Sequence, residues 1–267
     1  MKMILLCLHG WGGSKESFTE LRKALEGTDS EILTPDLPGF GTEPEPTTVW
    51  GIDEYTEWVE EWLHKTYNLQ PTLRPPVQGL RTPQGLERRA HGREATYNLL
   101  LLGHSFGGQI AVKLALRGNL PIRHLFLCAP AAIRPCFSLK RTVGYVIAKC
   151  GKTLLALPGL HLLQPIFRAV LYRLMGVHDY ERASPLMQKT MLRVTHQDLT
   201  QELHRLSLPV DLFWGLDDRI TPLWKGQRMN KLIPGSSIHA FPNTRHGVHR
   251  DRAQEIAAII TARINRK

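Results

Sequence analysis

The chain has 267 residues, of which 42% are hydrophobic and 22% are charged, and its formal net charge is +10 at pH 7. This length suits one α/β domain with an insertion, or two small domains, and allows a substantial buried core. The composition by itself indicates only a globular protein.

The positive charge is concentrated in two segments. Residues 131–207 carry eleven lysines and arginines against four acidic residues, residues 70–96 carry five against two, and the remainder is balanced. Neither segment interleaves aromatic with basic residues, and no nucleic-acid-binding motif occurs, so we expect no nucleic-acid partner. A basic amphipathic segment can also lie on anionic lipid. We favour a solvated surface for residues 131–207 and keep contact with a membrane as an alternative.

The first residues and the cysteines bear on the cellular compartment. The apolar run Met3–Leu8 is too short for a signal peptide or a membrane span. The four cysteines have no metal-ligand spacing, and two of them lie in apolar runs; they are Cys7, Cys128, Cys136 and Cys150. We expect all four to be thiols in a reducing compartment, and we predict a cytoplasmic protein.

Six strands alternate with helices along the chain. Apolar or β-branched runs predict strands at Met3–Leu8, Glu31–Thr34, Tyr97–Gly103, Ile122–Cys128, Val210–Trp214 and Ser237–Phe241. Helical patterns occur at Glu16–Glu26, Asp53–Tyr67, Phe106–Arg117, Leu223–Ile233 and Asp251–Asn265. In the first of these, Ser17 and Glu20 have capping-box spacing. Buried strands that alternate with helices predict a mostly parallel sheet covered on both faces.

Two segments interrupt this alternation. Residues 131–207 are helical in pattern, with an apolar stripe opposite basic residues, and we interpret them as a helical insertion between two strands. Residues 70–96 contain prolines, glycines and five arginines without periodicity, which predicts an exposed, flexible insertion. The core domain would then consist of residues 1–130 and 208–267.

A serine stands at the sharp turn between a predicted strand and a predicted helix. The sequence from Gly103 to Gly107 reads "GHSFG", a G-x-S-x-G pattern with Ser105 at its centre. Small residues two positions either side let the strand and helix approach each other, which exposes the serine hydroxyl beside the next backbone N–H. The alternative is a glycine-rich turn with an incidental serine.

Together with "LHGWGGS" (Leu8–Ser14) and "DLPGFG" (Asp36–Gly41), this serine motif resembles the α/β-hydrolase superfamily of the serine hydrolase type. The resemblance implies the α/β-hydrolase fold, with residues 131–207 as a helical cap. Because the chain begins at the strand that leads to the oxyanion loop, the family's first hairpin is missing and we expect about six strands. The resemblance makes Ser105 the nucleophile and the backbone N–H groups of Trp11 and Phe106 the oxyanion hole.

The acid is expected after the nucleophile and before the histidine. The stretch "LFWGLDDRITP" resembles the family's acid loop in a register that selects Asp218, with Asp217 as the rival. Alternatively, both carboxylates cap the helix that begins near Pro222. No acid follows the strand that ends at Cys128, which removes another acid position used in the superfamily.

The base is expected after the last strand. There "FPNTRHGVHRD" resembles the family's base loop and its register selects His246. His249 is the second candidate, expected to be exposed at the start of the last helix. His9 and His104 adjoin the active loops, and we interpret both as structural, because a base must approach Ser105 from another chain direction.

These assignments predict a hydrolase that cleaves an ester, a thioester or a related acyl bond of a small molecule through an acyl-enzyme. The resemblance implies no metal and no cofactor. A serine at position 105 argues against haloalkane dehalogenase and epoxide hydrolase chemistry, in which the nucleophile is a carboxylate. The open alternatives are a C–C bond hydrolase, an aminopeptidase or a cofactor-free haloperoxidase of the same fold, a non-catalytic ligand-binding protein, and a membrane-docking lipase.

Overall fold

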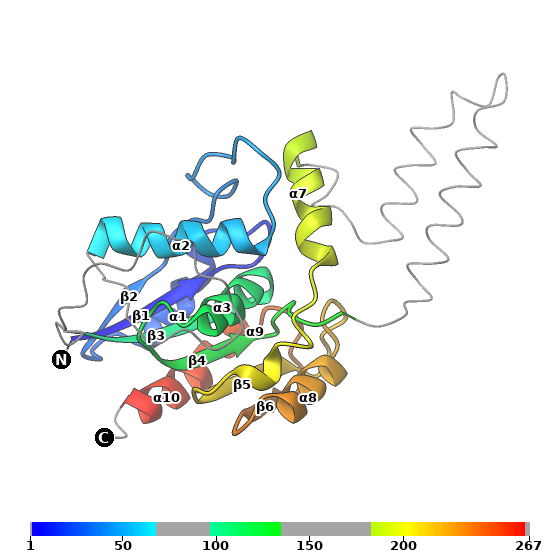
Figure 1. Cartoon of the computed structure of the whole chain (residues 1–267). Helices are drawn as coiled ribbons and strands as arrows, with labels where there is room; N and C mark the ends of the chain where they lie inside the picture. Colours follow the sequence, from blue (N-terminus) through cyan, green and yellow to red (C-terminus); the bar gives the residue numbers. More distant parts are fainter. Residues whose placement is uncertain (1, 68–96, 135–182, 265–267) are drawn as a thin grey trace, which may run out of the picture.

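A six-stranded parallel sheet forms the centre of the protein (Figure 1). The computed structural model describes residues 2–67, 97–134 and 183–264. The strands are β1 (Lys2–Leu8), β2 (Ser30–Leu33), β3 (Tyr97–His104), β4 (Ile122–Cys128), β5 (Val210–Gly215) and β6 (Ser237–Phe241), in the order β2-β1-β3-β4-β5-β6. The mostly parallel sheet of about six strands is thus confirmed, and each predicted strand end lies within one residue of the observed one.

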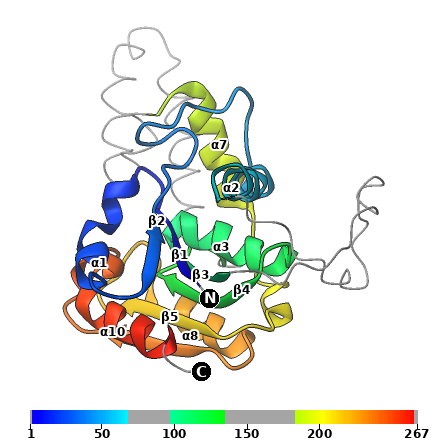
Figure 2. The ribbon, with the colours of Figure 1, turned by 90° about the vertical axis from the view of Figure 1, so that its left-hand side faces the viewer.

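Helices cover both faces of the sheet. The described helical elements are η1 (Lys15–Phe18), α1 (Thr19–Ala24), α2 (Ile52–Tyr67), α3 (Ser105–Arg117), α7 (Pro185–His196), η3 (Leu203–Arg205), α8 (Leu223–Leu232), α9 (Val248–Asp251) and α10 (Ala253–Ile264). In Figure 2, α1 and α10 lie on one side of the sheet, and α2 and α3 lie on the other. On β5, α10 reaches Asp211 whereas α8 packs against Trp214, and residues three apart on a strand point to opposite faces.

The two central strands, β1 and β3, are buried on both faces. Leu5 and Leu6 of β1 and Leu101 and Leu102 of β3 have no exposed surface. Strands of a parallel sheet with both faces covered become continuous apolar runs rather than alternating ones. This explains why both segments are recognisable in the sequence as uninterrupted leucine-rich stretches.

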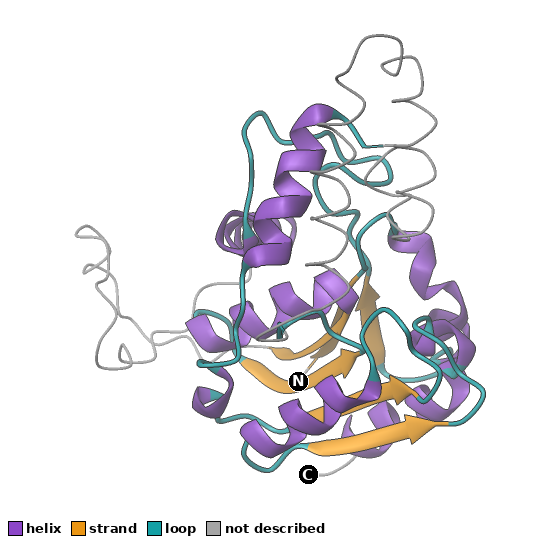
Figure 3. Ribbon diagram, turned by 90° about the vertical axis from the view of Figure 1, so that its right-hand side faces the viewer, coloured by secondary structure: helices purple, strands orange, loops and turns teal. Residues whose placement is uncertain are grey.

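The chain leaves β1 and β3 in opposite directions. After β1 the next strand lies on the outer side, at β2, whereas after β3 it lies on the other side, at β4. The carboxyl ends of β1 and β3 are neighbours, with Leu8 opposite Gly103. All strands point the same way, so the loops that follow them gather at one edge (Figure 3). In open α/β sheets, ligands bind at such a switch point.

The first helical segment begins at Lys15, one residue earlier than predicted, and its capping residue is three residues earlier. The capping box consists of Ser14 and Ser17 rather than Ser17 and Glu20. Ser17 lies inside a 3-10 turn, where its hydroxyl accepts the N–H of Ser14 at 3.2 Å, and the N-cap residue of the following helix is Phe18, which makes no side-chain capping bond. The helix also ends at Ala24, two residues before the predicted end at Glu26.

The last helical segment also differs from the prediction. A single helix over Asp251–Asn265 was expected, but a short helix, α9, precedes α10, and the backbone breaks at Arg252 with φ −126° and ψ 36°. The helical turns therefore begin at Val248, two residues after His246. The sequence pattern did not indicate this because α9 has four residues, too few for a helical period.

Part of the predicted cap is described. Residues 183–207 contain α7, whose N-cap Ser184 accepts the N–H of Met187 at 3.1 Å. Thr190 accepts the N–H of Trp50 at 3.2 Å, and Arg193 pairs with Glu54 at 2.6 Å, so α7 is tied to the start of α2. Residues 135–182 and the predicted insertion at residues 70–96 lie outside the described residues. None of the described helices is long and apolar enough to cross a membrane.

Candidate active site

Ser105 occupies a strained turn between β3 and α3. Its φ is 51°, in the left-handed region that non-glycine residues rarely adopt. A side chain on Gly107 would collide with the carbonyl of Leu8, and a Cβ on Gly103 would lie 2.6 Å from the carbonyl of Gly107. The glycines therefore allow α3 to pack close against β1 and β3, which forces the sharp turn at Ser105.

The loop after β1 runs alongside this serine. A Cβ on Gly10 would lie 3.3 Å from the Cβ of Ser105, which shows how closely the two chains approach. The rings of Trp11 and Phe106 meet edge to face at 5.3 Å. Within the described part of the chain, neither the Trp11 nor the Phe106 backbone N–H donates to a group outside the regular elements, and Phe106 is the second residue of α3, where an N–H has no acceptor in its own helix. Two free donors thus belong to the segments that meet at Ser105.

His9 holds this loop through main-chain bonds. Its Nδ1 donates to the carbonyl of Gly10 at 2.8 Å, and its Nε2 accepts the N–H of Leu37 at 2.9 Å. A ring that donates at one nitrogen and accepts at the other is neutral. Burial lowers the pKa of His9, and the bond to Gly10 and the charge of Asp36 offset this only in part. Both of its nitrogens are used by the fold.

Asp218 and His246 form a buried pair. Nδ1 of His246 donates to Oδ2 of Asp218 at 2.7 Å, although α8 and β6 lie between the two residues in sequence. Oδ1 of Asp218 accepts the backbone N–H groups of Ile220 and Thr221 at 2.8 and 2.9 Å. Burial raises the pKa of the Asp218 carboxyl, but the His246 and Thr221 hydrogen bonds outweigh it and hold this pKa below its ordinary value.

The rival carboxylate lies elsewhere. Asp217 is exposed, and its backbone N–H bonds to the carbonyl of Thr244 at 2.9 Å. The helix-capping interpretation is wrong for both residues, because the N-cap position of α8 is Pro222 and no side chain caps it. Asp218 instead accepts backbone hydrogen bonds within the loop that leads to this helix.

His249, the second candidate for the base, is buried rather than exposed as predicted. Only 5% of it is accessible, because α9 begins directly after the base loop and turns the ring inward against Phe18 and His104. Burial, the charge of Arg250 and the neighbouring His246 lower the pKa of His249 to about 3. Its Nδ1 has no hydrogen-bond partner among the described residues.

Two contacts of the candidate site were not predicted. The hydroxyl of Thr221 donates to Oδ2 of Asp218 at 2.8 Å and lies 3.2 Å from Nδ1 of His246. Nε2 of His104 donates to the backbone carbonyl of His246 at 3.0 Å. A hydroxyl three residues after an aspartate was a signal for the first contact, since such side chains bond within local turns. The second joins residues far apart in sequence and had no local signal.

Of the predicted catalytic residues, the structure joins the acid and the base by a hydrogen bond. Within the described residues, neither the Ser105 hydroxyl nor Nε2 of His246 makes a hydrogen bond. His104, next to Ser105, lies against His246 with ring centroids 4.8 Å apart. The described residues contain no group of three or more His, Cys, Asp or Glu side chains arranged to hold a metal ion.

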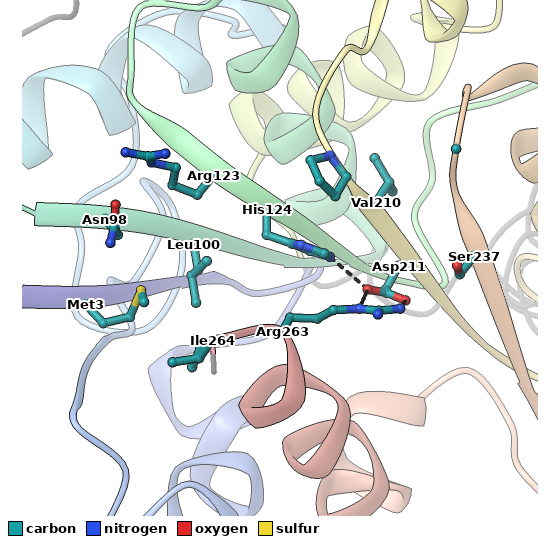
Figure 4. Close-up of a pocket in the computed structure, with 12 residues that line it drawn as sticks. Met3, Asn98, Leu100, Arg123, His124, Val210, Asp211, Ser237, Arg263 and Ile264 are labelled. Carbon is teal, nitrogen blue, oxygen red and sulfur yellow. Dashed lines mark hydrogen bonds and ion pairs between the residues drawn. The ribbon is translucent and has the colours of Figure 1, made fainter. Parts of the chain in front are cut away.

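A separate cavity of about 660 Å³ opens at the other edge of the sheet, where the strands begin (Figure 4). Its central feature is Asp211, which is 1% exposed and accepts hydrogen bonds from His124 and His239 at 2.7 Å each. Arg263 donates to both carboxylate oxygens at 2.9 and 3.0 Å. This carboxylate is fully paired inside the fold, which makes it a structural group rather than a reactive one.

Comparison with known proteins places the chain in a family. The model of the alpha/beta hydrolase family matches residues 5–259. An uncharacterized hydrolase, YugF, of Bacillus subtilis is 25% identical over 96% of this chain and 88% of its own length. A pimeloyl-[acyl-carrier protein] methyl ester esterase of Nitrosomonas europaea is 27% identical over 91% of this chain and 88% of its own.

Among solved structures, an esterase from Exiguobacterium antarcticum superimposes with a TM-score of 0.67 at 18% identity, covering 98% of this chain and 91% of the esterase. At this identity the likeness shows a shared fold only, and membership of the family rests on the match to the family model. Three observations point to the same family. They are the parallel sheet, the serine turn at its switch point, and the match of the family model over most of the length. The chain belongs to the alpha/beta hydrolase family of enzymes.

Proposed function

We propose that the protein is a serine hydrolase that cleaves an ester, a thioester or a related acyl bond through an acyl-enzyme. The observation that carries this proposal is the hydrogen bond of 2.7 Å between His246 and Asp218, beside a serine held at φ 51°. A serine hydroxyl is a weak nucleophile until a base removes its proton, and that base needs an orienting acid.

In the proposed reaction, Nε2 of His246 takes the proton of Ser105 while Oγ attacks the acyl carbon. The tetrahedral intermediate collapses when His246 returns this proton to the departing alcohol or thiol, which leaves the acyl group on Ser105. Water then attacks the acyl carbon, gives a proton to His246, and releases the carboxylic acid as Ser105 recovers its proton. Asp218 keeps Nδ1 protonated and stabilises the imidazolium.

The proposed oxyanion hole consists of the backbone N–H groups of Trp11 and Phe106. Within the described residues neither N–H donates outside the regular elements, Phe106 is in the first turn of α3, and the two segments meet beside Ser105. Preorganised donors of this kind stabilise the oxyanion, and the loss of one typically costs about two to three orders of magnitude in rate.

The proposed partner is a small-molecule acyl substrate. The Nitrosomonas europaea relative is named a methyl ester esterase, so methyl esters are a natural first class to test after activated esters. The interpretation of residues 131–207 as a cap over the site belongs to the same proposal. The cytoplasm is the proposed location, and the free thiols of Cys7 and Cys128, both buried, fit a reducing compartment.

The deciding experiment compares the wild type with Ser105→Ala in p-nitrophenyl ester hydrolysis and in labelling by a fluorophosphonate probe. Turnover and labelling that both disappear in the variant would support the serine hydrolase. Labelling without turnover would direct the search to amide, C–C or other acyl substrates. If the wild type neither turns over nor reacts with the probe, the ligand-binding alternative gains and the proposal fails.

A further inference from the structure

His104 connects the serine turn to the base loop. It is the last residue of β3 and precedes Ser105 directly, with the extended backbone angles φ −103° and ψ 131°. It is the N-cap residue of α3, yet its side chain makes no capping bond to that helix. Its Nε2 donates instead to the carbonyl of His246, 3.0 Å away. Because a carbonyl only accepts, this nitrogen carries the ring proton.

Three other segments hold the ring in place. The ring of His249, in α9, lies with its centroid 3.9 Å away at an interplanar angle of 37°. The ring of His246 lies on another side at 4.8 Å. A Cβ on Gly10 would come within 2.8 Å of Nδ1 of His104, so the loop after β1, which contains Gly10 and Trp11, closes the remaining side of the ring. One imidazole therefore contacts the segments that carry the proposed base and one proposed oxyanion donor.

The electrostatic surroundings favour the neutral ring that this arrangement needs. Burial, His249 and His246 hold the pKa of His104 well below its ordinary value. No carboxylate among the described residues bonds to the ring to oppose this. A neutral imidazole with its proton on Nε2 can donate from that nitrogen alone, so its hydrogen bond always goes to the same acceptor.

We propose that His104 is a positioning residue, which fixes the distance between His246 and Ser105 by holding the His246 carbonyl from the residue next to the nucleophile. This inference rests on the proposed function. The ring of His246 is already held at Nδ1 by Asp218, and the bond from His104 holds its main chain. With both held, Nε2 of the base has little freedom to drift from the nucleophile. A misplacement of about 1 Å in such a site costs about 10²-fold in rate.

Two substitutions separate positioning from simple filling of space. In His104→Gln, the side-chain amide can donate at about the place of Nε2, whereas His104→Leu keeps an apolar bulk and removes the donor. We expect kcat for a p-nitrophenyl ester to fall by about 10²-fold in His104→Leu with little change in KM, and by only a few-fold in His104→Gln. His204→Leu, at an exposed position in η3, is the matched control and should retain wild-type kcat.

A second readout does not require turnover. The proton between His246 Nδ1 and Asp218 should give a far-downfield signal in proton NMR. We expect this signal to be kept in His104→Gln and to shift or broaden in His104→Leu. This arm tests the positioning of His246 even if the wild type hydrolyses no ester, so failure of the proposed function and failure of this inference are distinguishable.

The inference is overturned if the Leu and Gln variants lose kcat by the same factor, or if the Leu variant changes neither kcat nor the NMR signal. Should circular dichroism show that His104→Leu does not fold, His104→Asn replaces it, because its shorter amide cannot reach the His246 carbonyl. Asn should then behave as the defective variant and Gln as the competent one. Loss of folding in the Gln variant as well would assign His104 a structural role and overturn the inference.

Discussion

Oδ2 of Asp218 lies 2.7 Å from Nδ1 of His246, while the neighbouring carboxylate of Asp217 points into solvent. The carboxylate of Asp218 is completely enclosed, and the side chain of His246 retains 17% of its accessible surface. One partner is thus anchored inside the fold, and the other still reaches the surface of the site. Two adjacent aspartates differ in this way because the chain turns sharply after β5.

This contrast predicts different effects of the same substitution. Asp218→Asn should lower kcat by about 10⁴-fold, because an amide no longer fixes the tautomer of the histidine or stabilises its protonated form. Asp217→Asn, its matched control, should change kcat by no more than about twofold, since an exposed residue without contact to the base affects neither. Steady-state kinetics on one ester settles the comparison. A large loss in the Asp217 variant would contradict the assignment of the acid.

The hydroxyl of Thr221 provides a finer test of the same pair. Thr221→Val keeps the shape but removes the donor that lies 2.8 Å from Asp218, whereas Thr221→Ser keeps the donor. We expect kcat to fall by about tenfold in the Val variant, from the typical worth of one hydrogen bond to a charged group, and to stay near wild type in the Ser variant. The loss of this bond should also raise the pKa of Asp218 toward its ordinary value. Equal kcat values and equal pH profiles in the two variants would count against a role for the hydroxyl.

Asp211 should be important for stability but not for catalysis. Burial raises the pKa of this carboxyl, yet the hydrogen bonds from His124, Arg263 and His239 outweigh it and leave the pKa well below its ordinary value. Asp211→Ala should cost about 3–5 kcal/mol in the free energy of unfolding, because it leaves the buried His124 and the partly buried His239 and Arg263 without their acceptor. Urea denaturation would measure the loss. The folded variant should retain wild-type kcat, since Asp211 lies at the edge of the sheet where strands begin.

The same carboxylate predicts a pH dependence. A depressed folded-state pKa contributes stability above the ordinary pKa of an aspartate, about 3.9, and this contribution is lost as the pH falls toward the folded-state value. Between about pH 5 and pH 3, the free energy of unfolding should therefore fall more steeply in the wild type than in Asp211→Ala. Glu61→Gln, which breaks an exposed ion pair with Lys65, is the control and should follow the wild type. Parallel curves for wild type and Asp211→Ala would refute the prediction.

His249 makes the free energy of unfolding depend on pH in a second, higher range. Its folded-state pKa of about 3 lies below the value in the unfolded chain, so the unfolded state binds one more proton as the pH falls below about 6.5. This costs about 1.4 kcal/mol of stability per pH unit in that range. His249→Phe keeps a ring against Phe18 without a titrating group, so its stability should fall less steeply between about pH 6 and pH 4. Chemical denaturation at several pH values would measure the two slopes, and equal slopes would contradict the burial of a neutral ring.

The sequence predicted the strands well because β1 and β3 are buried on both faces, and short uninterrupted leucine runs are typical of such strands. It also identified Asp218 and His246 as partners, since each follows a strand in a motif of fixed register. It did not predict the burial of His249, because the short helix that turns this ring inward has no period to detect. The bond from His104 to His246 joins positions 142 residues apart and depends on folded geometry alone.

All six strands run in the same direction, and the chain meets the two long segments outside the described residues at opposite ends of these strands. Residues 68–96 lie in sequence between α2 and β3, and β3 begins at its end away from Ser105. Residues 135–182 lie between β4 and α7, and the chain enters them from the edge at which Ser105, Asp218 and His246 stand. The chain therefore re-enters the described core at the amino end of β3 after residues 68–96, and it leaves this core at the carboxyl end of β4 before residues 135–182.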